Sequence, residues 1–211
     1  MIFKITLTVI MLVVAASFAF FYLQHKTDSS HTKISALFDA ITIGDSNKVK
    51  TILVEHAIDI NNVYDEEGST PLTAAIHYER SSIVKMLISY GADPNKIDNL
   101  LMSPLRLAAI TGNYGVFTLL IKNGARFSEE KTLIIAAAHG GNSKIVKQLR
   151  YDGADVNVHD ANGMAPLHEA STAEVAELLI KAGASINDKD HNGDTPLHTA
   201  VRENVEQSLT S

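Results

Sequence analysis

Four short segments of similar sequence recur along the chain at nearly regular spacing, and this recurrence constrains the fold more than any other feature. The segments read YGADPN at 90–95, NGARFS at 123–128, DGADVN at 152–157 and AGASIN at 182–187. The first two glycines, Gly91 and Gly124, are 33 residues apart. Self-similarity with a period of about 20–50 residues is the signature of stacked repeats. The chain is therefore predicted to fold as an array of similar units.

A second segment recurs between these, as DEEGSTPLTAA at 65–75, DNLLMSPLRLAA at 98–109, DANGMAPLHEA at 160–170 and DKDHNGDTPLHTA at 188–200. The last copy opens like a calcium-binding loop, with Asp188, Asp190 and Asn192 before Gly193. The twelfth position of such a loop must supply a bidentate carboxylate, and here it holds Thr199. We therefore predict a tight turn without calcium, because Asn-Gly tolerates the positive φ that such turns require.

Together the two segments resemble the ankyrin repeat, whose pattern joins D-x-x-G-x-T-P-L-H-x-A-A to a Gly-terminated helix and G-A-D-x-N. The resemblance covers residues 33–206, in about six units of which the first and last are degenerate. It implies an all-α ankyrin repeat solenoid of stacked helix-turn-helix units with β-turn fingers. It also implies a non-enzymatic protein–protein interaction module without cofactor or metal. The expected domains are a signal-anchor or signal peptide at 1–25, a linker at 26–32, the repeats at 33–206 and a tail at 207–211.

The helix boundaries can be derived from residue chemistry alone. A hydroxyl residue before proline starts a helix, because the hydroxyl caps free N–H groups and proline at the first position loses no hydrogen bond. This pair occurs at 70–71, 103–104 and 195–196, whereas Ala165-Pro166 lacks the hydroxyl. Glycines should end the first helices at 44, 112 and 141, and the second helices at 91, 124, 153 and 183. The second helices carry apolar stripes that only a stack can bury.

Several departures from the regular pattern are informative. Gly124 and Gly153 are only 29 residues apart, and the missing four fall between Ser128 and Thr132, so this finger is shortened. A smaller loss falls between the two helices of the next unit, at EASTAEVAE. Glu79 stands where a helix-terminating glycine belongs, and Leu101 stands where a turn glycine belongs.

The N-terminal segment differs in composition from the repeats. Lys4 is followed by nineteen uncharged residues, from Ile5 to Leu23, and about twenty apolar residues span a bilayer as a helix. We expect an N-terminal hydrophobic helix that anchors the chain, although Ser17-Phe18-Ala19 could be a cleavage site for a signal peptidase. With Lys4 retained inside, the repeats face outward. We interpret the short N-terminal region as bacterial, which places the repeats in the periplasm, anchored to the inner membrane or free after cleavage.

Charge and motifs narrow the function classes. The formal net charge is −6 and no basic stripe occurs, which argues against binding to nucleic acid. The chain has no cysteine. Metalloprotease, serine-hydrolase and phosphate-binding motifs do not occur. The expected function is that of a monomeric scaffold for one protein partner. An immunity protein that neutralises a secreted toxic enzyme, or an accessory protein of an envelope enzyme, is the alternative.

Histidine and glutamate positions are expected to be structural or solvated. His168 and His198 of the Pro-Leu-His segments should hydrogen-bond the backbone near the fingers. His77 and His139 should lie at the exposed edge of the first helices. The adjacent glutamates at 66–67 and 129–130 are expected to mark solvated turns rather than a general acid and base.

The resemblance places the partner site on the concave face formed by the finger tips and the ends of the first helices. The exposed variable positions there are Glu66, Glu67, Ser69, His77, Tyr78, Asn99, Leu100, Met102, Ile110, Thr111, His139, Ala161, Asn162 and Met164. The apolar finger Leu100-Leu101-Met102 allows two accounts. Either it folds over the gap left by its shortened neighbour, or it forms an exposed patch with Tyr78, Ile110 and Met164. We favour the exposed patch, because such patches mark interaction sites.

Overall fold

The computed structural model describes residues 31–56, 58–127 and 130–202, and all regular secondary structure in these ranges is helical. A first helix covers residues 31–43 and a last one covers 196–202. Between them lie α2 (Ser46–Glu55), α3 (Pro71–His77), α4 (Ser81–Ser89), α5 (Pro104–Ile110), α6 (Tyr114–Lys122), α7 (Leu133–His139), α8 (Ser143–Tyr151) and α9 (Ala173–Lys181).

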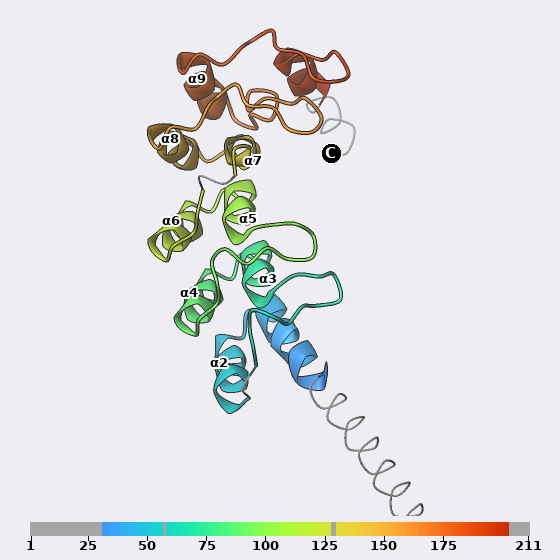
Figure 1. Cartoon of the computed structure of the whole chain (residues 1–211), viewed down its shortest axis with the longest axis vertical. Coiled ribbons are helices and arrows are strands. Elements are labelled where there is room, and N and C mark those ends of the chain that lie inside the picture. Colours follow the sequence, from blue (N-terminus) through green and yellow to red (C-terminus); the bar gives the residue numbers. More distant parts are fainter. Residues whose placement is uncertain (1–30, 57, 128–129, 203–211) are drawn as a thin grey trace, which may run out of the picture.

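These helices form two columns that run the length of the repeats (Figure 1). The first helices of successive units stack on one another, since α5 packs against both α3 and α7. The second helices stack beside them, with α4 against α6 and α8 against α9. The fingers project from the first-helix column, on the side away from the second helices. This arrangement confirms the predicted all-α repeat solenoid.

The first helices begin where the hydroxyl-proline pairs predict. Thr70 caps α3 by accepting a hydrogen bond from the backbone N–H of Thr73, whose own hydroxyl accepts from the N–H of Thr70. Ser103 caps α5 by accepting from the N–H of Arg106. Both capping residues are buried, so each cap also satisfies polar groups that water cannot reach.

The core lies between the two columns and continues from unit to unit. Alanines such as Ala75, Ala108 and Ala137 are fully buried on the first helices, where their small side chains let neighbouring helices approach closely. Each second helix contributes a buried apolar stripe, such as Ile145, Val146 and Leu149 of α8. The stripes meet across the stack, as the repeat pattern requires.

Backbone geometry confirms the alignment of the units. The predicted terminating glycines at 44, 112 and 141, and those at 91, 124, 153 and 183, all have positive φ. Glu79 and Leu101, which replace glycines in the pattern, also have positive φ, of 58° and 62°. The array therefore holds two ordinary side chains in a backbone conformation that favours glycine.

The fifth unit departs from the helix-turn-helix pattern. Its first segment, at 166–169, is a turn and not a helix, so the expectation of two helices in every unit is wrong here. Two causes are visible in the sequence: Ala165 supplies no capping hydroxyl, and the unit is short of residues before α9. The His168 Nδ1 accepts the N–H of Ala165 at 3.1 Å, which satisfies the backbone of the capping position but supplies no acceptor for the N–H groups that follow.

The predicted anchor or signal at 1–25 and the tail at 207–211 lie outside the described residues, as does the linker up to residue 30. Residues 31 and 32, which the prediction assigned to the linker, belong to the first helix. In the ranges that the structure describes, every helix is too short or too polar to span a bilayer.

Candidate functional site

Each finger is organised by one aspartate. In the finger at 98–102, hereafter finger B, Asp98 Oδ1 accepts the backbone N–H groups of Leu100 and Met102. Asp190 does the same for the N–H groups of Asn192 and Asp194. Asp190, the second aspartate of the calcium-like stretch, is thus already bonded to its own turn. This geometry supports the prediction of a tight turn at 188–194.

The fingers stack in two pairs. Finger A (65–69) is joined to finger B by a hydrogen bond from the Asn99 N–H to the Gly68 carbonyl oxygen, at 2.9 Å. Finger C (160–164) is joined to finger D (190–194) in the same manner, from His191 N–H to Asn162 O at 3.0 Å. Pairing between neighbours makes each pair a continuous surface, as expected of a finger face.

Between fingers B and C the shortened connection takes a different course. Glu130 donates its N–H to the Phe127 carbonyl oxygen rather than to finger B. The hydroxyl of Ser103 donates to the carboxylate of Glu130, and Arg106 Nη1 donates to Thr132 Oγ1 at 3.2 Å. The expectation that Glu130 is solvated is wrong, because the shortened connection draws its carboxylate onto the start of α5. Its neighbour Glu129 lies outside the described residues.

The histidines occupy the predicted places. His168 is buried, and its Nε2 lies 3.2 Å from the carbonyl oxygen of Asp194 in finger D. His198 Nδ1 accepts from the backbone N–H of Thr195 at 3.2 Å. His77 and His139 are exposed at the ends of α3 and α7, and His139 Nδ1 lies 2.8 Å from Glu169 Oε2. The structural role predicted for His168 and His198 is confirmed.

Every residue predicted for the partner site is accessible, since each is exposed or half-buried. The exposed ones are Glu66, Glu67, His77, Asn99, Leu100, His139, Ala161 and Asn162, and the half-buried ones are Ser69, Tyr78, Met102, Ile110, Thr111 and Met164. Ile110 packs against the hydrophobic core. Met164 belongs to finger C, in the second pair of fingers. That these residues bind a partner remains a prediction.

One group of predicted residues surrounds a hollow at the start of the array. Glu66 and Glu67 of finger A, Tyr78 at the end of α3 and Phe38 of the first helix line it, and its volume is about 400 Å³. The ring of Tyr78 meets that of His77 edge to face, with centroids 5.1 Å apart. The hollow therefore combines aromatic walls with carboxylates.

Finger B and the residue before it carry a cluster of exposed apolar side chains. Leu100 is 57% exposed and Leu101 is 83% exposed, and the nearby Ile97 is 53% exposed. The account in which this finger folds over and buries its leucines is therefore wrong. Other exposed apolar residues, such as Tyr151 of α8 and Ile180 of α9, lie on separate helices. Scattered residues of that kind are normal on a soluble surface, whereas a cluster marks a contact site.

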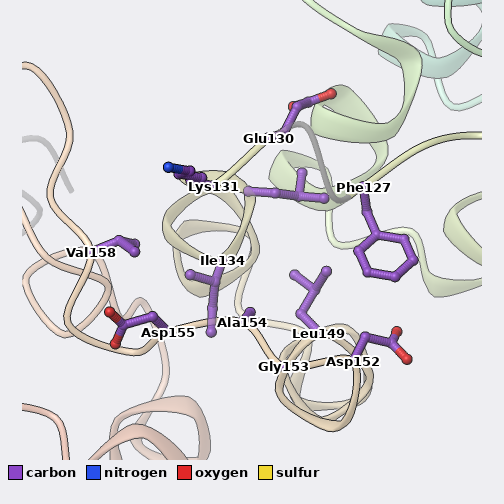
Figure 2. Close-up of a pocket in the computed structure, with 11 residues that line it drawn as sticks. Phe127, Glu130, Lys131, Ile134, Leu149, Asp152, Gly153, Ala154, Asp155 and Val158 are labelled. Atoms are coloured by element: carbon purple, nitrogen blue, oxygen red, sulfur yellow. The ribbon is translucent and has the colours of Figure 1, made fainter.

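A second hollow lies beneath the shortened connection, between α7 and α8 (Figure 2). Phe127, Ile134 and Leu149 point into it, and Asp152 and Asp155 lie at its edges. Sequence reasoning identified the shortened connection but not this hollow. The signal in the sequence that accompanies it is the loss of four residues just before α7.

Within the part of the chain that the structure describes, two carboxylates have clearly lowered pKa values. The hydroxyl of Ser143 and then the ammonium of Lys147 hydrogen-bond Glu174 and lower its pKa. The side-chain amide of Asn62 and then the backbone N–H of Asn61 lower the pKa of Asp59. A general acid working near neutral pH needs the opposite shift. Neither carboxylate therefore has the raised pKa of such an acid. Asp59 orders its own turn through Asn61 and Asn62, and Glu174 joins α9 to α8 through Lys147.

Comparisons with known proteins agree with this geometry. The family model described as ankyrin repeats in three copies matches residues 10–98, 37–131 and 133–209. The chain is 34% identical over 131 residues to alpha-latrocrustotoxin-Lt1a of Latrodectus tredecimguttatus, covering 60% of this chain and 9% of the toxin. It is 33% identical over 144 residues to neurogenic locus notch homolog protein 1 of Danio rerio, covering 64% of this chain and 6% of that protein.

Neurogenic locus notch homolog protein 2 of Homo sapiens gives a similar result, at 34% identity over 144 residues and 6% of its length. The chain thus spans less than a tenth of these curated relatives, and what it shares with them is the repeat array. Repeats of this kind are protein–protein interaction modules, typically without catalytic activity. From the family match, the stacked helix pairs and the glycine positions, we conclude that this chain belongs to the ankyrin repeat family.

Proposed function

We propose that this chain is a non-enzymatic scaffold that holds one protein partner on the finger face. The observation that carries the proposal is the exposure of Leu100 and Leu101 on finger B. An exposed leucine contributes nothing to folding, whereas burying it against a partner stabilises the complex by about 1.5–3 kcal/mol. Turns at the surface are ordinarily polar, so this apolar finger is best explained by a contact with another molecule.

The proposed partner is a protein rather than a nucleic acid. The chain carries 24 acidic residues against 18 basic ones, and binding to a phosphate backbone depends on basic clusters. The proposed scaffold acts as a monomer.

We further propose that the N-terminal segment tethers the array to a membrane. The support is its sequence: Lys4 precedes an uncharged run from Ile5 to Leu23, long enough for one span. With Lys4 on the inner side the repeats lie outside. In a Gram-negative bacterium this is the periplasm, and cleavage after Ala19 leaves the array free in the same compartment.

Immunity against a secreted toxic enzyme, or service as an accessory protein of an envelope enzyme, is a specialised form of the same function. In both cases the finger face occludes or positions one partner. A neighbouring gene that encodes a secreted toxic enzyme favours the immunity role. The scaffold proposal does not depend on this choice.

Capture of the partner from membrane fractions tests the proposal. The variant Leu100→Asp combined with Tyr78→Ala should keep its thermal midpoint, because Leu100 is exposed and Tyr78 is half-buried at a helix end. The partner is first identified with the unchanged chain. The double variant should then bind this partner at least tenfold more weakly, a difference of about 1.4 kcal/mol. The matched control is Tyr151→Ala on α8, which should capture normally. Undiminished capture by a folded double variant contradicts the proposed site.

A further inference from the structure

The interruption in the row of fingers leaves a notch on the far flank of finger B. Fingers A and B form one pair and fingers C and D form another, with α7 between the pairs (Figure 1). Leu101 of finger B and the preceding Ile97 line one side of the notch, and Arg106 of α5 and Lys131 of the shortened connection line the other. Its volume is about 440 Å³.

The turn glycines show what normally fills this place. A Cβ added to Gly68 of finger A meets Asn99 of finger B at 2.7 Å, and one added to Gly163 of finger C meets His191 of finger D at 2.6 Å. The turn position of each stacked finger thus faces the next finger at close range. In finger B the same position holds Leu101, whose side chain is 83% exposed and lines the notch.

Leu101 breaks two local preferences at once. Its φ of 62° lies in the region that favours glycine, and a side chain there is strained. Its apolar surface also faces water. A residue that is unfavourable for both reasons within the isolated array is explained when a second molecule covers it.

The opposite wall of the notch is basic. Arg106 and Lys131 line this wall together with Glu130, so its formal net charge is +1. The Glu130 carboxylate accepts from the Ser103 hydroxyl, and Arg106 Nη1 donates to Thr132 Oγ1. This is a local positive site on a chain whose formal net charge is −6. Such a site is complementary to a carboxylate set next to an apolar side chain.

We propose that the notch is a docking site in which an extended segment of the partner protein takes the place of the missing finger. An apolar side chain of that segment packs on Leu101 and Ile97. A neighbouring Asp or Glu binds Arg106 and Lys131. This inference rests on the proposed scaffold function and names the chemistry of the segment that the scaffold recognises.

A peptide selection tests the inference without knowledge of the partner. A phage library of random twelve-residue peptides is selected on the full-length chain in detergent, and synthetic copies of enriched peptides are measured by fluorescence anisotropy. We expect enriched peptides to pair an apolar residue with an acidic one. Their affinity should fall at least tenfold in Leu101→Gly, while the thermal midpoint of this variant stays the same or rises because the glycine relieves the positive φ.

The matched control is Glu79→Gly, which relieves the same backbone conformation away from the notch and should bind the peptides normally. Lys131→Glu should weaken binding at least tenfold, and Lys122→Glu on α6 should not. One outcome contradicts the notch as docking site but is compatible with the scaffold function. In it, the peptides bind Leu101→Gly with unchanged affinity but bind the Leu100→Asp, Tyr78→Ala variant more weakly. Enrichment of basic peptides, or no enrichment at all, also overturns the inference. Absence of any captured protein partner is the separate result that removes the scaffold function.

Discussion

At the scale of single residues, the glycines of this array serve two different purposes. Gly124 and Gly153, which follow the second helices, have φ of 93° and 91°, and a Cβ at either position meets no atom within 4 Å. Backbone conformation alone requires glycine there. Gly68 and Gly163 have positive φ as well, but they also lie against the next finger. The first kind of glycine marks helix ends, and the second marks finger stacking.

Replacing Gly124 or Gly153 with Val should therefore destabilise the array through backbone strain and not through a clash. We expect a loss of about 1–2 kcal/mol in the free energy of unfolding, the cost of a side chain in the left-handed region. Chemical denaturation followed by circular dichroism measures it. The matched control is Gly115→Ala within α6, where an added Cβ lies 3.5 Å from Asn113 Oδ1 in ordinary contact. The Gly115→Ala change should raise the free energy of unfolding by about 0.5–1 kcal/mol. Unchanged denaturation midpoints in both Val variants would contradict the alignment of the repeats.

At the scale of elements, each finger is a self-contained turn held by its aspartate, and the fingers differ in what lies beside them. The hydroxyl-proline caps and the Asp-turns follow from local sequence, because their hydrogen bonds join residues within four positions. The turn that replaces a helix at 166–169 and the notch beside Leu101 both occur where a unit is shorter than the regular repeat. Sequence spacing located both deletions, but only the packed array shows what surrounds them.

The finger at 190–194 gives a direct test of the turn against a calcium loop. Asp190 Oδ1 already accepts two backbone N–H groups, and Asp188 Oδ2 lies 2.7 Å from His159 Nε2. We expect millimolar calcium to leave the thermal midpoint unchanged, since only a ligand that binds the folded state raises it. Asp190→Ala should lower the midpoint equally with and without calcium. A calcium-dependent rise that this variant abolishes contradicts the turn interpretation.

At the scale of the whole molecule, two columns of helices form the base, and the fingers form a surface whose residues differ from unit to unit. The family, the helix order and the registers of the glycines could be predicted from sequence, because each unit repeats the same local signals. The exposure of Leu101 and the contact of Glu130 with Ser103 could not be predicted, because they follow from contacts between units that differ in length. The proposed partner site belongs to this second class, because a fold does not determine what its surface binds.

The orientation of the proposed tether can be measured independently of the partner. A reporter that is active only outside the cytoplasm, fused after Ser211, should be active if, as proposed, Lys4 holds the amino terminus inside. If a reporter that is active only in the cytoplasm works at the same junction, the repeats face the cytoplasm and the proposed orientation is wrong. An immunoblot separates the two forms of export, because cleavage after Ala19 removes about 2 kDa from the chain.

The central claim is that finger B, and not the second-helix column, contacts the partner. Site-specific photo-crosslinking in cells tests it most directly, with a photoreactive residue placed at Leu100 in one strain and at Tyr151 in another. Both positions are exposed, at 57% and 89%, so each probe is free to react with whatever lies beside it. The account predicts one discrete crosslinked protein from position 100 and none from position 151. A discrete adduct from position 151, with none from position 100, contradicts it.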